Sequence, residues 1–542
     1  MITIHVQEQT IQKSQPFRLE ELANQLGIHT VAATVNNRLR ELSYVVSQNA
    51  KIDFLTTANY DYGRIYATSM RYLVVMVAKK LFPKAQIKFL NSISMGIYGR
   101  FVEGVITPEM VHAIKLEMKR MIDLNLPIIR KQMPITKVKQ IYKQEGYFDK
   151  VETLKYRKEI VNIYECDGYL NYMYGYMVPS TGYLKEFEIL SYYPGFLIRY
   201  PRLEAKGQIP EFTDSPAFLR VLNRAEQWAI RCQAEMIFQM NQIVEKKSEV
   251  AFVNMCETRH NQQLCELGAL LEDDIANIRL IAIAGPSSSG KTTFSKRLEI
   301  ELLTRGIKPL MISIDNYYFS SDHVPRDEYN QPDFEHIEAL DLSLFHSNIA
   351  DLIAGKAVAL PRYSFKEQKR VFLEPLVIDQ KTPIIIEGIH ALNDRLSHFI
   401  PADQIFKIYI SPFAQINIDY NNPINLTDQR LLRRIVRDLQ FRGTSAEKTL
   451  DMWPSVRRGE YKWIYPFVER ANYIYNSELT YELLVMKRYA LDALLRIPND
   501  SEHFIQANRL IKFLKLFKEI NPYLVPCNSI LREFIGKSVF EH

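Results

Sequence analysis

A glycine-rich loop between an apolar run and a helical segment constrains this chain more than any other feature. Residues 279–284 read RLIAIA, which is typical of a buried parallel strand. Residues 285–292 follow as GPSSSGKT, with the spacing Gly-x-x-x-x-Gly-Lys-Thr, and the next stretch, TTFSKRLEIELL, has helical periodicity. This order forms a phosphate-binding loop (P-loop), because small residues let successive backbone N–H groups turn inward onto phosphate oxygens. The pattern predicts an α/β fold with a doubly wound parallel sheet.

The loop and the start of its helix supply the expected nucleotide contacts. The positive end of the helix dipole adds to the inward-turned amides. Lys291 is expected to bridge the β- and γ-phosphates of ATP, and the Thr292 hydroxyl is expected to hold Mg²⁺. The residues expected to bind ATP are Gly285, Ser287, Ser288, Ser289, Gly290, Lys291, Thr292 and Thr293.

Two acidic residues follow strand-like runs. The run 309–314 ends at Asp315, and the run 383–386 ends at Glu387. Ligands of doubly wound sheets lie at the carboxyl ends of the strands. Asp315 is therefore expected to accept the proton of an attacking hydroxyl, with a helix cap or a surface acid as the alternative. Glu387 is expected to support Mg²⁺, and His390 either contacts substrate or packs against the sheet end.

Arginines gather in the sequence RLLRRIVRDLQFRG, residues 430–443. Arg430, Arg433, Arg434 and Arg437 recur at three- and four-residue steps, which places them on one helical face. Guanidinium groups so placed repel each other unless an anion neutralises them, and a triphosphate in its transition state is such an anion. A solvated helix face is the alternative.

Length and composition add few constraints. At 542 residues the chain is too long for one core, so several domains are expected. A net charge of +6 suits a polyanionic ligand but does not indicate a nucleic-acid surface. The absence of a leader or a long apolar run favours a cytoplasmic protein without membrane contact. The five cysteines, without a CxxC pair, are expected to be reduced: Cys166, Cys232, Cys256, Cys265 and Cys527.

The first region, 1–58, is predicted to be a small β-grasp fold. Residues 2–6 alternate as a strand, 19–27 form a short helix, and 31–42 form a hairpin. The fragment VNNRLRELSYVVSQNAKIDFL resembles the TGS domain, the ubiquitin-like module of threonyl-tRNA synthetases. An RNA contact through the front half is therefore one of the partner expectations.

The second region, 59–214, is predicted to be an α+β domain with a helix at 66–81. The fragments KKLFP and VPSTG resemble the editing domain that follows TGS in the same synthetases. The metal and proton-transfer positions of that family match Thr68, Tyr72, Met173 and Met177, none of which suits either role. No hydrolytic or metal chemistry is expected here.

The remaining chain is predicted to comprise a helical linker at 215–277, a P-loop kinase domain at 278–490 and a helical segment at 491–542. His260, in the linker, is expected at the surface. The amphipathic stretch NRLIKFLKLFKEI near the C-terminus is expected to pack within the chain or to form a homo-oligomer.

Residues 278–487 resemble the uridine kinase and phosphoribulokinase family of P-loop proteins. The resemblance rests on the ordered motifs GPSSSGKTT, IDNYYF, QPDF, PRYSFKEQKR, EGIHAL, RLLRRIVRDLQFRG and YPFVERANYIYNS. It implies an ATP- and Mg²⁺-dependent kinase that phosphorylates the 5′-hydroxyl of uridine or a related nucleoside. The order TGS, editing-like domain and kinase also resembles a known arrangement among bacterial nucleoside kinases.

The resemblance also implies roles for single residues. Asp315 resembles the general base, and the catalytic set becomes Asp315, Lys291, Arg434 and Arg437. Arg437 and Arg442 resemble lid arginines on the ATP phosphates. The residues implied on the substrate side are Asp315, Tyr318, Asp333, Tyr363, Arg370, His390 and Arg434.

Three departures from the family pattern concern the acceptor and the lid. Ser364 stands where an aspartate is usual, Gln368 where a base-contacting histidine is usual, and Thr444 where an arginine often follows. A kinase of another small hydroxyl compound, such as a sugar phosphate, is therefore a second hypothesis. An RNA-binding regulatory NTPase is a third, against which the mild net charge argues.

Overall fold

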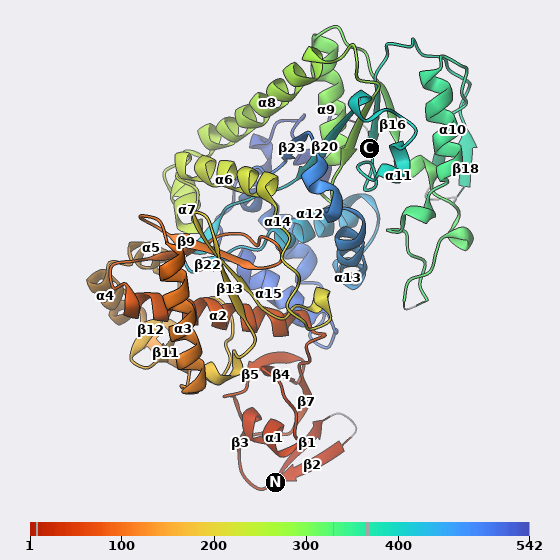
Figure 1. Cartoon of the computed structure of the whole chain (residues 1–542). Helices are drawn as coiled ribbons and strands as arrows, with labels where there is room; N and C mark the ends of the chain where they lie inside the picture. The colour runs from red at the N-terminus through yellow and green to blue at the C-terminus, as the bar shows by residue number, and fades with distance from the viewer. Residues whose placement is uncertain (7–8, 329, 365–368, 541–542) are drawn as a thin grey trace.

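The computed structural model describes residues 1–6, 9–328, 330–364 and 369–540. A small sheet at the N-terminus is followed by a mixed middle region and then by a large unit around a parallel sheet (Figure 1). Within these described ranges, no helix is both long and apolar enough to cross a bilayer.

The N-terminal region is a five-stranded sheet in the order β2-β1-β7-β4-β5, with helix α1 (Leu19–Gln25) packed on it. Its β4–β5 hairpin turns at Asn36 and Asn37, whose φ angles are 48° and 57°, a conformation that asparagine tolerates in two-residue hairpins. The predicted strands, helix and hairpin are all present. The strands are β1 (Ile2–Val6), β2 (Gln9–Lys13), β3 (Phe17–Arg18), β4 (Ala32–Val35), β5 (Arg38–Glu41), β6 (Val45–Val46) and β7 (Ala50–Phe54).

The middle region is built around helix α2 (Tyr60–Leu81), which begins six residues before the predicted start. A four-stranded sheet, β13-β14-β9-β8, and a three-stranded sheet, β10-β11-β12, flank it. The strands are β8 (Ile87–Phe89), β9 (Ile97–Phe101), β10 (Ile129–Pro134), β11 (Ile160–Cys166), β12 (Tyr169–Asn171), β13 (Glu188–Tyr192) and β14 (Gly195–Arg199). The other helices are α3 (Pro108–Asp123), α4 (Ile135–Glu145) and α5 (Phe148–Thr153).

The positions matched to the editing-domain motif lie inside this region. Tyr72, Met173 and Met177 belong to its buried hydrophobic core, and Thr68 is 4% exposed beside them. The Thr68 hydroxyl donates a hydrogen bond to the carbonyl oxygen of Arg64, one turn back along α2. These side chains fill the interior of the region.

The large unit contains a five-stranded sheet in the order β16-β19-β15-β20-β23, with every neighbouring pair parallel. β15, which leads into the predicted phosphate-binding loop, is the central strand. The strands are β15 (Leu280–Ala284), β16 (Leu310–Ser313), β19 (Ile384–Glu387), β20 (Ile405–Ser411) and β23 (Tyr473–Asn476). Two short hairpins accompany it, β17 (Pro361–Ser364) with β18 (Lys369–Phe372) and β21 (Asn417–Asp419) with β22 (Asn422–Pro423).

Both faces of this sheet are buried. Ile281 and Ile283 of β15 belong to one hydrophobic core, whereas Leu280, Ala282 and Ala284 belong to another. Successive side chains of a strand point to opposite faces, so the alternation means that helices cover each face. This explains why the strand reads as a continuous apolar run, and it confirms the predicted parallel α/β sheet. The helices before β15 are α6 (Pro216–Arg231), α7 (Ile237–Glu245) and α8 (Glu249–Asp273), and the next are α9 (Lys291–Thr304), α10 (Leu342–Ile353), α11 (Asp394–Ser397), α12 (Leu426–Phe441) and α13 (Ala446–Trp463).

The segment 215–277 is helical as predicted, but it is not a linker. Leu264, Leu267 and Leu271 of α8 pack in the same core as Ile281 and Ile283 of β15. The expectation for His260 was wrong, because this side chain is 1% exposed, hydrogen-bonded at 2.8 Å to the carbonyl oxygen of Glu478. The helical periodicity predicted α8 correctly, but it did not reveal which sheet the helix covers.

The C-terminal segment also belongs to the large unit. Leu510 and Leu514 of α15 (Phe504–Leu514) and Leu531 of α16 (Arg532–Ile535, with its N-cap at Leu531) share the core that contains α14 (Glu482–Leu494). The expected packing of the amphipathic C-terminal stretch is confirmed, whereas the separation of 491–542 from the kinase unit is not.

Buried polar contacts fasten the middle region to the large unit. The Lys150 ammonium lies 3.1 Å from the Asp419 carboxylate, and both side chains are almost fully buried. Asn417, from the same β21–β22 hairpin as Asp419, donates to the carbonyl oxygen of Phe89 at 2.8 Å. The backbone N–H of Phe89 donates to the carbonyl oxygen of Tyr420 at 2.8 Å. Such satisfied buried groups fix the two regions relative to each other.

Candidate active site

The phosphate-binding loop lies at the carboxyl end of the central strand. A Cβ at Gly285 would collide with the carbonyl oxygen of Ile410 on the adjacent strand β20, so only glycine fits there. Gly290 caps α9 in the left-handed conformation, with φ of 89°, and Ser288 is also left-handed at 61°. These turns bring the backbone of the loop around the first turn of α9.

The loop side chains leave a cradle with unused hydrogen-bonding groups. The Lys291 ammonium folds back and donates to the carbonyl oxygen of Gly285 at 2.9 Å. The hydroxyls of Ser288, Ser289 and Thr293 are buried and, within the described part of the chain, have no hydrogen-bond partner. Buried polar atoms without partners are costly, so this cradle fits an anion with several acceptor oxygens, such as the phosphates of ATP.

The two predicted acids lie at the carboxyl ends of neighbouring strands. Glu387 is the last residue of β19, and its carboxylate accepts a hydrogen bond from the Ser313 hydroxyl at 3.0 Å. Asp315 lies in the 3-10 turn Ile314–Tyr317 that directly follows β16. The structure therefore places both acids at the carboxyl edge of the sheet, beside the loop.

The electrostatics of these groups are coupled to Lys291. Burial and the like charge of Asp315 raise the pKa of Glu387 to about 7, and the Lys291 charge opposes the rise. Burial also raises the pKa of Asp315, again opposed by Lys291. Burial lowers the pKa of Lys291, which the two carboxylates oppose. Two carboxylates that repel each other favour a bound cation or proton between them.

A magnesium ion at this site would depend on the nucleotide for part of its coordination. Among the described residues, no group of three or more His, Cys, Asp or Glu side chains is arranged to hold a metal. Thr292 and Glu387 supply two oxygen-bearing side chains, and Mg²⁺ is commonly completed by phosphate oxygens and water. The donor set fits an ion that arrives with ATP.

The predicted arginine face of α12 divides into two groups. Arg430 and Arg433 are buried, and they pair with the carboxylates of Glu460 and Glu482. Protein carboxylates, and not a ligand, therefore neutralise these two arginines. Both also hold the loop, since Arg430 Nε donates to the carbonyl oxygen of Ser287 at 3.2 Å and Arg433 Nη1 donates to that of Ser289 at 3.4 Å.

Arg434, Arg437 and Arg442 form the second group and share one carboxylate, Asp438. Arg434 Nη1 also donates to the Ser287 hydroxyl at 2.9 Å. The charges of Arg437 and Arg442 oppose the rise in the pKa of Asp315, so both lie within electrostatic range of that carboxylate. One acid for three guanidinium groups leaves positive charge for a polyanion at the loop.

The residues implied on the substrate side are spread around the same edge. Tyr318 is 8% exposed and donates to the carbonyl oxygen of Phe334 at 3.0 Å, while the Asp333 carboxylate accepts from the backbone N–H of Glu335 at 3.1 Å. Arg370 on β18 pairs with Asp341 at 2.9 Å.

The two remaining substrate-side residues, Tyr363 and His390, have other contacts. The backbone N–H of Tyr363, on β17, donates to the Asn316 side chain at 3.1 Å, next to Asp315 in the chain. His390 is 1% exposed, and its ring packs at 5.9 Å from the ring of Trp463, which is the packing alternative. Burial lowers the pKa of His390 to about 3.

Of the three residues that depart from the family pattern, the structure describes Ser364 and Thr444. The backbone of Ser364 pairs with Lys369 at the end of the β17–β18 hairpin. Gln368 lies outside the described residues. The Thr444 hydroxyl donates to the carbonyl oxygen of Arg442 at 3.3 Å, just after the arginine-rich helix.

The part of the chain around β15 matches known proteins. The model of the phosphoribulokinase / uridine kinase family matches residues 280–482. The uridine kinase of Macrococcus caseolyticus (strain JCSC5402) is 34% identical over 184 residues, which make up 33% of this chain and 78% of that protein. This chain belongs to the phosphoribulokinase/uridine kinase family.

Two further proteins are similar to this family member. The uridine kinase of Brevibacillus brevis (strain 47 / JCM 6285 / NBRC 100599) is 32% identical over 185 residues, 34% of this chain and 77% of that protein. A solved structure described as a possible uridine kinase from Bacillus stearothermophilus is 18% identical, covers 43% of this chain and 100% of that chain, and has a TM-score of 0.27.

Three carboxylates of this family member were missed by the sequence analysis. Glu460 and Glu482 are far along the chain from the arginines they neutralise, so no local pattern links them. Glu335 lies two residues after Asp333, and burial raises its pKa to about 7 while the charge of Arg434 opposes the rise. Its position beside QPDF was the one local indication of a role near the acceptor.

Proposed function

We propose that this chain is an ATP-dependent nucleoside kinase that phosphorylates the 5′-hydroxyl of uridine or a related nucleoside. The observation that carries the proposal is the convergence of Asp315 and Lys291 beside a complete phosphate-binding loop, in a stretch about one-third identical to uridine kinases. The reaction class is a phosphoryl transfer to an alcohol.

In the proposed reaction the loop and Lys291 hold the phosphates of ATP. The Lys291 ammonium leaves the carbonyl oxygen of Gly285 and turns to the β- and γ-phosphates. Mg²⁺, when bound, neutralises charge on the phosphate oxygens, and Thr292 and Glu387 are the residues that would hold it. Arg434, Arg437 and Arg442 stabilise the charge that develops on the transferred group.

Asp315 has the proposed role of general base. Its carboxylate accepts the proton of the 5′-hydroxyl as that oxygen attacks the γ-phosphorus, while the bond from the γ-phosphorus to the β–γ bridging oxygen breaks and ADP leaves. The raised pKa of Asp315 makes the carboxylate a better proton acceptor than an exposed aspartate, as long as it is deprotonated at the working pH. Asp333, Tyr363 and Arg370 are proposed to position the acceptor.

A second acceptor class remains a candidate because of the chain's departures from the family pattern. Ser364 replaces an aspartate and Gln368 replaces a histidine at positions that the resemblance places near the base. These changes favour a different base, or a small hydroxyl compound such as a sugar phosphate. The phosphoryl-transfer residues are the same in either case.

A substrate panel tests the proposed function. We expect ADP release from the full-length chain to be stimulated by at least one nucleoside and by phosphosugars much less. Lys291→Ala serves as the inactive reference, and Lys308→Ala, at an exposed lysine beyond α9, serves as the matched control. Stimulation by phosphosugars alone would select the second acceptor class, and no stimulation by any hydroxyl compound would contradict a kinase.

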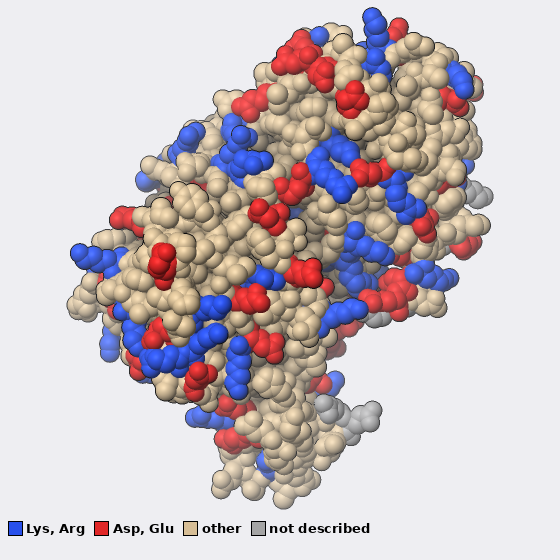
Figure 2. Space-filling model, viewed as in Figure 1, with Lys and Arg blue, Asp and Glu red and all other residues tan. Residues whose placement is uncertain are grey.

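The front half has its own, separate proposal. We propose that residues 1–58 and 59–214 are TGS-like and editing-like modules retained as a support for the kinase unit. The buried Lys150–Asp419 pair supports such a role. On the face shown in Figure 2, Lys and Arg are interspersed with Asp and Glu, which does not favour a nucleic-acid surface on that face.

A further inference from the structure

A segment near the C-terminus folds into a compact turn outside the stretch shared with the family. The Arg532 guanidinium is buried at its centre and donates to the carbonyl oxygens of Pro522 at 2.9 Å, Val525 at 2.6 Å and Gly536 at 3.3 Å. Arg532 Nε also donates to the carbonyl oxygen of Pro526 at 3.4 Å. Because one side chain satisfies four backbone acceptors, the segment 522–536 holds a defined shape. The family match ends at residue 482.

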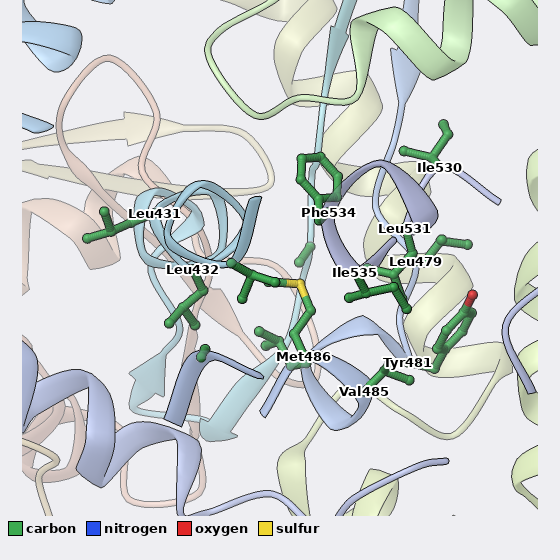
Figure 3. Close-up of a cluster of buried hydrophobic side chains, with 14 of the residues drawn as sticks. Leu431, Leu432, Leu479, Tyr481, Val485, Met486, Ile530, Leu531, Phe534 and Ile535 are labelled. Atoms are coloured by element: carbon green, nitrogen blue, oxygen red, sulfur yellow. The ribbon is translucent and has the colours of Figure 1, made fainter. Parts of the chain in front are cut away.

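Apolar contacts anchor this segment against the kinase unit. The side chains of Ile530, Leu531 and Phe534 are fully buried. Figure 3 shows α16, which carries Phe534, between the ribbon of α12, with Leu431 and Leu432, and Ile530 on its far side, and residues of α14 lie beside it. The Arg433 guanidinium lies 5.0 Å above the ring of Phe534. The backbone of α16 is therefore fixed, and so is the direction of the side chains it carries.

Glu533 on this fixed helix points at the phosphate-binding loop. Its carboxylate accepts a hydrogen bond from the backbone N–H of Thr293, in the first turn of α9, at 3.3 Å. Glu533 is 8% exposed. Its neighbour Ile530 comes so close to the loop that its Cγ2 lies 2.5 Å from where a Cβ at Gly290 would be.

The Glu533 carboxylate lies at the start of α9, where a phosphate group of the nucleotide is expected. The first backbone N–H groups of a helix have no partner within the helix, and together with the dipole they favour a negative charge. The Thr293 hydroxyl beside this amide is buried and unpartnered in the described structure, which independently indicates a ligand with further acceptor oxygens. The Glu533 charge also acts on Lys291 and Glu387, so it lies within the electrostatic range of the phosphate site.

We propose that the Glu533 carboxylate is an internal competitor of the donor nucleotide for the start of α9. Phosphate oxygens that bind this amide must turn the Glu533 side chain away, because two anions cannot share one donor without strong repulsion. Glu533 therefore lowers the affinity for ATP, and α16 itself stays in place. The inference rests on the proposed function only in taking the loop as a nucleotide site.

Titration calorimetry on the full-length chain tests the competition. Glu533→Gln removes the charge and keeps the volume, and we expect it to bind ATP about tenfold more tightly than the wild type, a factor in line with a charge at a helix N-terminus. Glu502→Gln, at a highly exposed glutamate of the same C-terminal region, is the matched control and should leave the affinity unchanged. An unchanged or weaker affinity in both Glu533→Gln and Glu533→Ala would overturn the proposal.

Two probes locate the effect on the phosphates. Inorganic triphosphate should gain affinity by a factor similar to that of ATP, whereas adenosine should bind wild type and variant equally. An equal gain for adenosine would mean that Glu533 acts on the shape of the site, which contradicts the proposal. Glu533→Ala provides a second variant with the same expected direction if the glutamine still hydrogen-bonds to Thr293.

The ATP-binding test of the Glu533 variants and the substrate test of the proposed function can fail independently of each other. Tighter ATP binding by the Glu533 variants, without phosphorylation of any nucleoside by the wild type, would leave the competition intact and reject the nucleoside kinase. Nucleoside phosphorylation with unchanged ATP affinity of the variants would do the reverse.

Discussion

Burial favours the protonated form of several carboxyl groups in this fold. Only some of them lie at the carboxyl edge of the parallel sheet, beside the phosphate-binding loop. Glu387 and Asp315 have raised pKa values next to Lys291, where a bound proton or cation would relieve the repulsion between the two carboxylates. Burial and the neighbouring charge of Glu482 raise the pKa of Glu478 further, to about 8. It lies in the interior, with one carboxyl oxygen lacking a partner among the described residues.

Glu478→Gln is predicted to stabilise the protein at high pH. In the folded chain Glu478 stays protonated up to about pH 8, whereas in the unfolded chain it ionises near pH 4.5, so the wild type loses stability as the pH rises between these values. Glutamine has no proton to lose. Urea unfolding should therefore show little difference at pH 5 and a gain on the order of 2–4 kcal/mol for the variant at pH 8.5.

The control for this experiment is Glu266→Gln, at an exposed glutamate of α8. It should change the free energy of unfolding by less than about 0.5 kcal/mol at both pH values. A gain for Glu478→Gln that does not depend on pH would show that the carboxyl group is not protonated in the folded state.

At the scale of elements, helix α12 connects the loop to the rest of the unit. Arg430 contacts the Ser287 carbonyl oxygen on one side and the buried Glu460 of α13 on the other. Arg433 makes the same kind of bridge to Glu482 at the start of α14. The two arginines thus position the loop, while the three arginines around Asp438 share one carboxylate and keep excess positive charge.

Glu460→Gln is predicted to destabilise the fold and to loosen the loop. The carboxylate also pairs with Arg457, so the change leaves two buried guanidinium groups without a charged partner. Breaking a buried pair in this way costs about 3–5 kcal/mol of unfolding free energy. Denaturant unfolding measures the loss, and weaker ATP binding should accompany it.

Asp451→Asn is the matched change on the same helix. Its carboxylate forms an exposed pair with Lys448, so a loss of less than about 1 kcal/mol is expected. Equal losses for the two variants would mean that the Arg430–Glu460 pair does not position the loop.

At the scale of the whole molecule, the front half and the kinase unit share a buried polar junction. Lys150 reaches Asp419, which also accepts hydrogen bonds from the Asn422 side chain at 2.8 and 2.9 Å. Such a junction predicts that the regions unfold together. Lys150→Met should remove about 3–5 kcal/mol, because it leaves the Asp419 charge buried without its cation.

Urea unfolding followed by two probes checks this junction. We expect coincident transitions in the wild type and an earlier transition of the front half in Lys150→Met. Lys155→Met, at an exposed pair with Glu152, is the control and should behave as the wild type does. Separate transitions already in the wild type would contradict the tight junction.

The sequence predicted the local parts of this molecule well. The strand-loop-helix motif determined the position of Lys291 and the parallel sheet, because both depend on residues close together in the chain. It could not predict that Glu460 and Glu482 would neutralise arginines of α12 or that Glu533 would reach the start of α9, because those contacts join residues 30, 49 and 240 positions apart. For the same reason α8 was taken for a linker, although its apolar face covers β15.

Asp315→Asn is the sharpest test of the proposal that Asp315 removes the proton from the acceptor hydroxyl. The variant should bind ATP within about twofold of the wild type and lose turnover by about 10²–10⁴-fold, since a positioned general base contributes on that order. Asp500→Asn, at an exposed aspartate, should retain full turnover. An Asp315→Asn enzyme with near-normal turnover would contradict the role of Asp315 as the general base.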